Sequence, residues 1–489
     1  MHRWLAGNVF FPLQEWLKGH PTFQILKNME AADSLTASEL TELRDEKLRD
    51  LLGYCGAHVP YVRMRFEEAG IQPTEIRTAR DLARLPLTRK ADVRRHRKQL
   101  RSNVAGTLSE IATGGSTGEP LICDLAKRRI ASRVACRQRV SKWWGVSVGD
   151  DEVALWGSPI ELGRQDRLRN FRDWLLATRL LPAFGMDESS MSRYLGMIET
   201  IRPRQVFGYP SALYLLSLHS QKHFKSMRQL GVKVVFVTGE VLLPDQRALI
   251  SETFNCPVAN GYGGRDSGFV AHECPQGGMH ILSDAVIVEV VDADGRPLGP
   301  GERGEIVVTD LYSHEVPFLR YATGDVGVLS ARSCPCGRAL PLFERIEGRA
   351  NDAIMTPDGR VINSLAVIYS VREIAGIEHF RIHQTAIDRF HVTIVRSQEF
   401  PPDAESRIRR GWTKLFRVPV HVTFEYAPFL QPERSGKFRH VVSELPVAKA
   451  LGSSPEKSPE SGATILPWGP ADFQGSVVRS SFDSVKEQA

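Results

Sequence analysis

The sequence has no long hydrophobic run. No stretch of the 489-residue chain approaches the roughly 18 apolar residues that a membrane-spanning helix needs. The opening segment MHRWLAGNVFFPLQEWLKGH is rich in aromatic residues, but Asn8, Pro12 and Gln14 interrupt it, and no cleavage site of a signal peptide follows. This segment could lie on a membrane or on a partner, but we favour packing onto the first domain.

Cysteine is scarce, and its seven copies are unevenly spaced. An odd number without regular spacing argues against a disulfide framework, so we expect a reducing compartment, the cytoplasm. Four of the cysteines are isolated in the sequence and are expected to be small buried hydrophobes: Cys55, Cys123, Cys136 and Cys256.

A strong excess of one charge is also lacking, since 63 basic residues oppose 57 acidic ones. The densest basic run, residues 89–101, is typical of a solvated helical face, and the other basic residues are dispersed. We therefore expect no nucleic-acid partner. The small positive surplus would suit an anionic substrate such as ATP or CoA.

The pattern of apolar residues predicts an α/β protein with two folded domains and a tail. Residues 1–105 form the helical part of a large domain, with a helix capped by Thr36 and Glu39. Residues 106–348 alternate strands and helices, as in doubly wound sheets, and then become rich in β-strands. Residues 349–448 follow a βαββαβ order typical of small ferredoxin-like α+β domains. Residues 449–489, rich in Ser, Pro and Gly, are expected to be a disordered tail.

The sharpest motif is TGGSTGEP, between two expected strands. Its glycines let backbone amides converge on phosphate oxygens, and its hydroxyl groups add donors. No lysine follows the last glycine, so it is not a Walker A loop. Alone, such a turn is more often an ordinary hairpin. The residues concerned are Thr113, Gly114, Gly115, Ser116, Thr117 and Gly118.

Further short motifs follow this loop in a fixed order. They are Gly239-Glu240, Gly261-Tyr262-Gly263, Tyr321-Ala322-Thr323-Gly324-Asp325, Gly348-Arg349 and Arg434-Ser435-Gly436-Lys437. Each is weak alone, but together with the loop they make the chain resemble the adenylate-forming superfamily. The long helical N-terminal part and the segments His272-Glu273-Cys274 and Cys334-Pro335-Cys336-Gly337-Arg338 are similar to its phenylacetate–CoA ligase branch, which includes capsule-associated relatives.

The resemblance implies an adenylate-forming large domain and a mobile C-terminal domain, and it implies roles for single residues. The 113–118 loop would hold the β- and γ-phosphates of ATP, and Lys437 would be the catalytic cation. The adenosine would contact Gly239, Glu240, Tyr262, Gly263 and Asp325, with Asp325 on the ribose hydroxyls. Arg349 would contribute to the nucleotide site and, with Asn351, form the hinge.

The activity implied is ATP-dependent conversion of a carboxylic acid to an acyl-adenylate, followed by transfer to CoA, with Mg²⁺ as cofactor. Asp266 stands near the position of the usual magnesium-binding Glu, and it is one methylene shorter. An acceptor other than CoA, AMP left on the substrate, and a catalytically weak nucleotide-binding homologue remain alternatives. The acid is not identified, and a homodimer stays open. Trp156, Phe207 and Tyr209 could line the acid pocket or belong to the core.

Two separated segments carry the ligand set of a structural zinc site. Five residues separate Cys274 from His280, and Cys334 and Cys336 flank a proline. Three thiols and an imidazole complete a closed tetrahedral site. The alternative is two unrelated loops with spare cysteines. His272 and Glu273 are expected beside the metal ligands as supporting groups.

Overall fold

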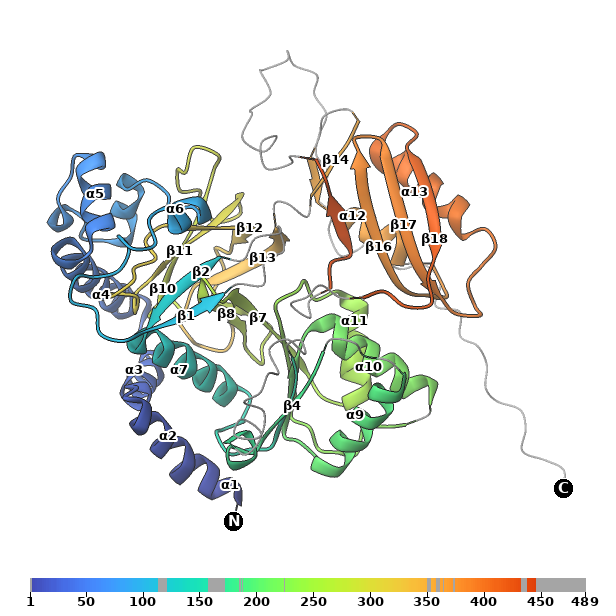
Figure 1. The fold of residues 1–489 in the computed structure, drawn as a ribbon, viewed down its shortest axis with the longest axis horizontal. Helices are drawn as coiled ribbons and strands as arrows, with labels where there is room; N and C mark the ends of the chain where they lie inside the picture. Colours follow the sequence, from blue (N-terminus) through green and yellow to red (C-terminus); the bar gives the residue numbers. More distant parts are fainter. Residues whose placement is uncertain are drawn as a thin grey trace. The chain divides into compact units, whose positions relative to one another are not determined.

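The computed structural model describes residues 2–112, 121–156, 172–183, 186, 188–223, 225–349, 353–357, 361–363, 365–372, 374–431 and 438–445 (Figure 1). Three predictions therefore fall outside the described residues: the phosphate loop 113–118, the positions of Asn351 and Lys437, and the tail 449–489.

Helices dominate the first hundred residues, as predicted. They are α1 (His2–Leu5), the π-helical η1 (Ala6–Phe10), α2 (Phe11–Lys18), α3 (Thr22–Ala32), α4 (Ala37–His58), α5 (Pro60–Ala69), η2 (Pro73–Glu75), η3 (Ala79–Arg84) and α6 (Lys90–Arg95). The predicted cap of α4 is confirmed: Glu39 N donates to Thr36 Oγ1 (3.3 Å), and Thr36 N donates to Glu39 Oε2 (2.8 Å). None of the described helices is long and apolar enough to cross a membrane.

A two-stranded antiparallel sheet, β1 (Leu108–Ala112) and β2 (Ile122–Ala126), flanks the predicted phosphate loop. The prediction that this loop connects two strands is therefore confirmed. The chain continues directly from β2 into α7 (Lys127–Trp143).

Parallel strands form one half of an 11-stranded sheet whose order is β10-β11-β12-β13-β9-β8-β7-β6-β5-β3-β4. This half comprises β3 (Glu152–Leu155), β4 (Thr178–Leu181), β5 (Gln205–Gly208), β6 (Val234–Thr238) and β7 (Val258–Gly264). The connecting helices are α9 (Glu188–Ile201), α10 (Pro210–Lys222) and α11 (Pro244–Phe254). Their apolar residues share one buried cluster with the strands, whereas Trp144 and Val146 pack with Phe236 in another. The predicted α/β architecture is confirmed.

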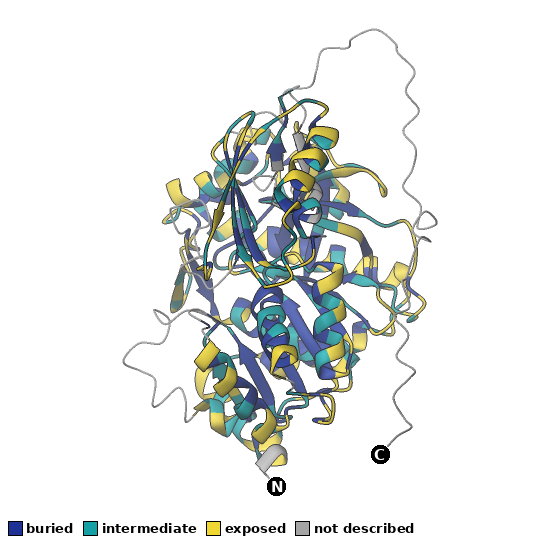
Figure 2. Ribbon diagram, turned by 90° about the vertical axis from the view of Figure 1, so that its right-hand side faces the viewer, coloured by how far each residue is buried: buried dark blue, intermediate teal, exposed yellow. Residues whose placement is uncertain are grey.

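The other half of the sheet is antiparallel, as predicted for the β-rich subdomain. It comprises β8 (Gly268–Glu273), β9 (Met279–Ile281), β10 (Val286–Val291), β11 (Arg303–Asp310), β12 (Tyr321–Leu329) and β13 (Leu342–Arg349). The N-terminal helices share a core with this half, in which Leu48 and Phe66 pack with Ile287 and Tyr321. Figure 2 shows the strands as the buried layer and the helices with exposed outer faces.

The C-terminal domain has the predicted order of elements but not a ferredoxin-like sheet. The hairpin β14 (Ala353–Met355) and β15 (Val361–Asn363) is a separate sheet. After α12 (Leu365–Arg372) come β16 (Ile377–Ala386), β17 (Arg389–Arg396), α13 (Ala404–Phe416), β18 (His421–Tyr426) and β19 (Val441–Ser443). These strands form a mixed sheet in the order β18-β17-β16-β19.

Two contacts explain this departure from the ferredoxin-like arrangement. The edge of β16 is taken by the parallel strand β19, a strand that the sequence pattern did not reveal. The first hairpin is instead joined to β16 through the buried side chain of Gln384. That side chain accepts a hydrogen bond from Met355 N (3.2 Å) and donates one to Met355 O (2.6 Å).

Candidate active site and cysteine cluster

Tyr262 and Asp325 bring two of the predicted motifs together. Tyr262 lies on β7 and Asp325 on β12, and the Tyr262 hydroxyl donates to Asp325 Oδ2 over 2.7 Å. Burial and the nearby Asp325 carboxylate raise the pKa of Tyr262 well above its usual value, so this hydroxyl remains a donor. Asp325 pairs with Arg349 in the register between β12 and β13. The backbone of Arg349 therefore lies directly beside the carboxylate strand.

Asp266 lies in the turn between β7 and β8, beside a second tyrosine. The Tyr321 hydroxyl donates to Asp266 Oδ2 (2.7 Å), and Ser267 N donates to Asp266 Oδ1 (3.0 Å). Burial acts to raise the pKa of Asp266, but the Tyr321 hydrogen bond and the positive charge of Lys90 lower it below its usual value. Asp266 is thus held as a carboxylate, the form that binds a hard cation.

Two arginines support this turn, and the sequence analysis missed them. Arg129 Nη2 donates to the backbone oxygen of Asp266 (2.5 Å), and Arg129 Nε pairs with the buried Asp310 (2.7 Å). Arg133 Nη2 lies 3.4 Å from the same oxygen of Asp266. Desolvation and the neighbouring Arg129 charge lower the pKa of Arg133 to about 9. Their spacing of four residues on one helix, just after the phosphate loop, was the available signal.

Close contacts and backbone conformation explain why glycine stands at several positions of the predicted motifs. A Cβ on Gly263 would lie 2.2 Å from the carbonyl oxygen of Gly268, so the β7–β8 hairpin closes only with glycine there. Gly239 has a φ of 85°, in the left-handed region that favours glycine. A Cβ on Gly348 would lie 3.1 Å from Val241, which places the 239–241 loop beside the end of β13.

Glu240 has a clear structural partner. Its carboxylate accepts hydrogen bonds from Ser211 N and Ser211 Oγ, each over 3.0 Å. Ser211 lies in the first turn of α10, where backbone N–H groups lack partners within the helix. Glu240 therefore caps α10 from another segment of the chain. No contact with a nucleotide is needed to explain this carboxylate.

The three aromatic residues proposed for an acid pocket form one cluster. Trp156 stacks on Tyr209 with ring centroids 4.1 Å apart, and it lies 5.1 Å from the Phe207 ring. Tyr209 is only 2% exposed and belongs to the core beneath α10. Trp156 and Phe207 are partly exposed. Of the three, Trp156 and Phe207 therefore keep surface that a ligand could contact.

The two halves of the cysteine and histidine set meet in the fold. Strand β9 pairs with β13, with Leu342 opposite His280, and this register joins the two segments. Cys274 Sγ lies 3.6 Å from Cys334 Sγ, and Cys336 Sγ lies 3.2 Å from His280 Nε2. All four ligand atoms lie within 4.8 Å of one another.

These distances fit one tetrahedral ion. Zinc–sulfur and zinc–nitrogen bonds place two sulfur ligands about 3.8 Å apart and a sulfur and a nitrogen about 3.6 Å apart. His280 Nδ1 donates to Leu340 O (3.2 Å), which leaves Nε2 unprotonated and directed at Cys336. Burial acts to raise the pKa of the Cys336 thiol, but the Arg338 backbone N–H and the Cys334 thiol lower it.

Close turns carry the cysteines. Gly277 N donates to Cys274 O (2.8 Å), and Gly337 N donates to Cys334 O (3.3 Å). Gly277 and Gly337 have φ values of 79° and 82°, which glycine adopts without strain. Each pair of ligands is therefore presented by a tight turn with a glycine at its end.

His272 and Glu273 do not support the cysteine cluster as predicted. The Glu273 carboxylate binds Arg247 of α11 (2.8 Å) and the backbone N of Asn260 (2.7 Å). His272 packs against Gly261 and donates from Nδ1 to Glu273 O (3.0 Å). His272 and Glu273 are successive residues of β8, so their side chains lie on opposite faces of the sheet. Their contacts are with β7 and α11 rather than with the cysteines.

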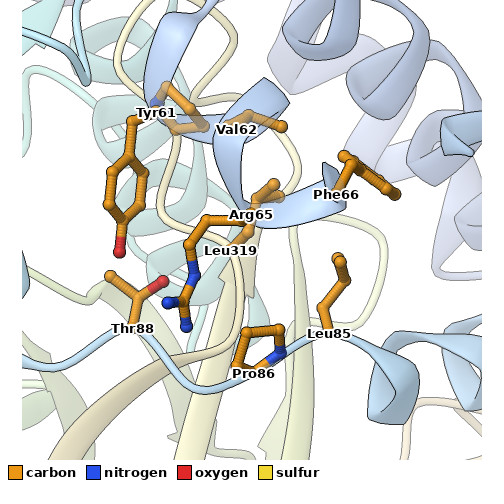
Figure 3. Close-up of a pocket in the computed structure, with 9 residues that line it drawn as sticks. Tyr61, Val62, Arg65, Phe66, Leu85, Pro86, Thr88 and Leu319 are labelled. Atoms are coloured by element: carbon orange, nitrogen blue, oxygen red, sulfur yellow. The ribbon is translucent and has the colours of Figure 1, made fainter. Parts of the chain in front are cut away.

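A small pocket lies between α5 and residues 85–88 (Figure 3). Its wall is mostly apolar, with Tyr61, Phe66 and Leu319 among its residues. The Arg65 guanidinium enters it but already binds Glu68 (2.9 Å) and the carbonyl oxygen of Leu87 (2.9 Å). None of the predicted nucleotide-binding residues lines this pocket.

Comparison with known proteins identifies two family matches. Residues 111–311 match the model of AMP-binding enzymes, and residues 354–444 match the CapK C-terminal domain. The phenylacetate-coenzyme A ligase of Thermus thermophilus is 28% identical over 385 residues, covering 75% of this chain and 84% of the relative. Protein CapK of Staphylococcus aureus is 21% identical over 426 residues, covering 83% and 90%. The phenylacetate-coenzyme A ligase of Escherichia coli K12 is 24% identical, covering 73% and 80%.

The fold is also that of a solved ligase. A 2-hydroxyisobutyryl-CoA ligase in its postadenylation state aligns with a TM-score of 0.70 and 21% identity, covering 86% of this chain and 93% of that chain. The matched segments contain the Tyr262–Asp266 region and the whole C-terminal mixed sheet. The chain therefore joins an AMP-binding domain to a CapK C-terminal domain, and its homologues, phenylacetate-coenzyme A ligases and protein CapK, are those of the adenylate-forming superfamily.

Proposed function

We propose that this chain activates a carboxylic acid with ATP and transfers the acyl group to CoA. A carboxylate oxygen attacks the α-phosphorus of ATP and pyrophosphate leaves, giving an acyl-adenylate. The sulfur of CoA then attacks the acyl carbon, its proton is lost, and AMP leaves. The observation that carries the proposal is the group formed by Tyr262, Asp325 and Asp266 inside the fold of adenylate-forming enzymes.

The positions of these side chains suggest how they divide the work. The Tyr262 hydroxyl orients the Asp325 carboxylate, which can accept hydrogen bonds from two vicinal ribose hydroxyls. Asp266 would hold Mg²⁺, whose charge offsets the negative charge that builds up on the phosphates. Arg129 and Tyr321 fix the backbone and the carboxylate of Asp266, and a fixed charge costs no reorganisation during the reaction.

Some of the remaining roles fall to residues outside those that the structure describes. The 113–118 loop would bind the β- and γ-phosphates, and Lys437 would supply a cation for adenylation. Arg349 and Asn351 would form the hinge that carries Lys437 in and out between the two half-reactions. Trp156 and Phe207 would border the acid, since they are the partly exposed members of the aromatic cluster.

ATP–pyrophosphate exchange with a panel of acids tests the proposal. The first acids to try are arylacetic acids and short hydroxy acids, which the names of the relatives suggest. Exchange dependent on one acid supports the adenylation step, whereas ATP binding without exchange with any acid would indicate a nucleotide-binding homologue. Adding CoA to a productive acid and measuring thioester tests the second step.

An acceptor other than CoA is the second candidate. The chain matches the CapK C-terminal domain and aligns along most of its length with protein CapK, a relative whose name, unlike those of the ligases, does not include coenzyme A. Exchange without thioester formation would select this candidate. It would leave the adenylation proposal intact.

We also propose that Cys274, His280, Cys334 and Cys336 bind one zinc ion. Four protein ligands leave no open position, so the ion would have a structural role. It would clamp the loop before β9 to the loop before β13. Since ATP and CoA are cytoplasmic metabolites and all seven cysteines are free thiols, we place the enzyme in the cytoplasm.

A further inference from the structure

The first helical segment of the chain carries an exposed apolar stripe. Helices α1, η1 and α2 follow one another without a break, and Figure 1 shows them as one rod beside the N label. The stripe consists of Trp4 (64% exposed), Val9 (38%), Leu13 (49%), Trp16 (74%) and Leu17 (70%). Two tryptophans with most of their surface in water are unusual on a folded domain.

The π-helical turn keeps the stripe on one side of the rod. In a regular α-helix with 3.6 residues per turn, Trp4 would point away from Leu13 and Trp16. Residues 6–10 form a wider turn with one extra residue, which rotates Trp4 into line with the other four. The opposite side carries Ala6, Phe11 and Glu15, all buried.

The buried side of the rod accounts for its attachment to the domain. A Cβ on Gly7 would lie 2.4 Å from the carbonyl oxygen of Val148, so the rod packs closely there. The favoured interpretation from the sequence, packing onto the first domain, is therefore confirmed for this side. It leaves the stripe without an explanation.

The charged residues of the first 29 positions are mostly basic. Glu15 is the only acidic residue among the first 29 residues, and it is 1% exposed. Its carboxylate accepts hydrogen bonds from Thr22 (2.5 Å) and His20 (3.1 Å). Lys18 and Lys27 are exposed, although Lys18 Nζ also lies 3.5 Å from Glu15 Oε1. Lys127 Nζ lies beside Gly19 at the end of α2.

The exposed apolar stripe and the basic residues of this segment favour one kind of binding partner. We propose that α1, η1 and α2 form an interfacial anchor that lies flat on an anionic phospholipid membrane. Tryptophan and leucine side chains enter the boundary between headgroups and acyl chains, and the lysines meet lipid phosphates. A second copy of the chain fits less well, because a twofold pairing of stripes would bring the same lysines together.

Vesicle flotation with the full chain tests the anchor. Vesicles of phosphatidylcholine with phosphatidylglycerol should carry the protein, and vesicles of phosphatidylcholine alone should carry much less. The double variant Trp16→Ser/Leu17→Ser should bind anionic vesicles roughly 30-fold more weakly, since two apolar side chains no longer leave water. Lys18→Gln and Lys27→Gln should each weaken binding about fivefold.

A matched control and a competing measurement complete the test. Trp174→Ser removes another exposed tryptophan (57% exposed) from a different segment and should leave vesicle binding unchanged. Absence of binding to anionic vesicles would overturn the proposal, and so would equal binding of the double variant. Self-association in analytical ultracentrifugation that the double variant loses would assign the stripe to a second copy instead and also overturn it. Thermal melts should match wild type, because the stripe is exposed.

Discussion

The Tyr262 hydroxyl lies 2.7 Å from Asp325 Oδ2, although three strands separate β7 from β12 in the sheet order. In a flat sheet these two strands would be about 19 Å apart. The contact therefore requires the antiparallel half of the sheet to curl back toward β7. This curl brings Tyr262 and Asp325, which are 63 positions apart in the chain, into one hydrogen-bonded pair.

Loss of this hydrogen bond should weaken nucleotide binding. We expect Tyr262→Phe to lower ATP affinity about five- to tenfold, because Asp325 loses the donor that orients it while the contact with the Phe343 ring remains. Calorimetric titration with ATP measures this. Tyr426→Phe is a matched control, since its hydroxyl also donates to a carboxylate, Glu405, over 2.7 Å. Equal affinity of Tyr262→Phe and wild type would remove Tyr262 from the nucleotide site.

Neutralising Asp266 should harm adenylation through magnesium. We expect Asp266→Asn to slow ATP–pyrophosphate exchange by about two to three orders of magnitude and to raise the Mg²⁺ concentration needed for half-maximal rate. Asp266→Glu should retain most of the rate, because it keeps the charge. Asp294→Asn, on an exposed turn, serves as the control. An unchanged magnesium dependence in Asp266→Asn would show that the ion is held elsewhere.

The cysteine cluster should hold one metal ion for each chain. We expect elemental analysis to find about one zinc, and Cys334→Ser to lose that zinc and to lower the melting temperature by several degrees, because metal binding is coupled to folding. Cys256→Ser changes another buried cysteine and should keep the metal. Metal-free protein of normal stability would contradict the zinc proposal.

Lys437 should act in only one of the two half-reactions. We expect Lys437→Ala to slow acyl-adenylate formation by roughly two to three orders of magnitude, with little change in ATP affinity. Supplied acyl-adenylate and CoA should still give thioester at close to the normal rate, because the hinge would have moved residue 437 away. Stopped-flow or quench measurements of each half-reaction separate these effects. Equal loss in both half-reactions of a folded variant would show that the domain does not alternate.

Lowering the pH should destabilise the folded protein, because the buried His272 would have to take up a proton. Burial lowers the pKa of His272 from 6.5 to about 4, so the unfolded chain takes up this proton before the folded one. The stabilisation from this residue is complete above pH 6.5 and disappears as the pH falls toward 4. Between pH 7 and pH 5 the protein should lose about 2 kcal/mol through this residue.

Urea unfolding of wild type and of His272→Gln at both pH values measures this difference. The variant cannot take up the proton, so its loss on acidification should be smaller by about that amount. Identical losses in the two proteins would mean that His272 titrates normally in the folded state.

Local patterns predicted local structure well. The Thr36 cap of α4 needs only residues three apart, and the strands around the phosphate loop follow from a short apolar run on each side. The metal set was predicted from ligand chemistry alone. Its geometry depends on the pairing of His280 with Leu342, which no local pattern encodes.

Long-range pairing explains what the sequence could not reveal. Arg129 contacts the backbone of Asp266 across 137 positions. The four-residue spacing of Arg129 and Arg133 indicates one helix face after the phosphate loop, but it does not indicate the partner of that face. Glu273 seemed close to the cysteines because it precedes Cys274, yet its carboxylate is taken by Arg247. In the C-terminal domain, hydrogen bonds between the Gln384 side chain and the Met355 backbone join β14 to β16 in place of a strand pairing. Hydrophobic periodicity does not predict a side-chain contact of this kind.

Strand β13 pairs at its first residue, Leu342, with His280, and at its last, Arg349, with Asp325. The pairing of β13 with β12 already contains two irregularities. A further one-residue insertion or deletion that no bulge absorbs would turn every later side chain to the other face of the sheet. Residues 331–333, between β12 and the first cysteine, belong to no strand. Homologues should therefore vary in length before Cys334 and keep a constant count of residues along β13.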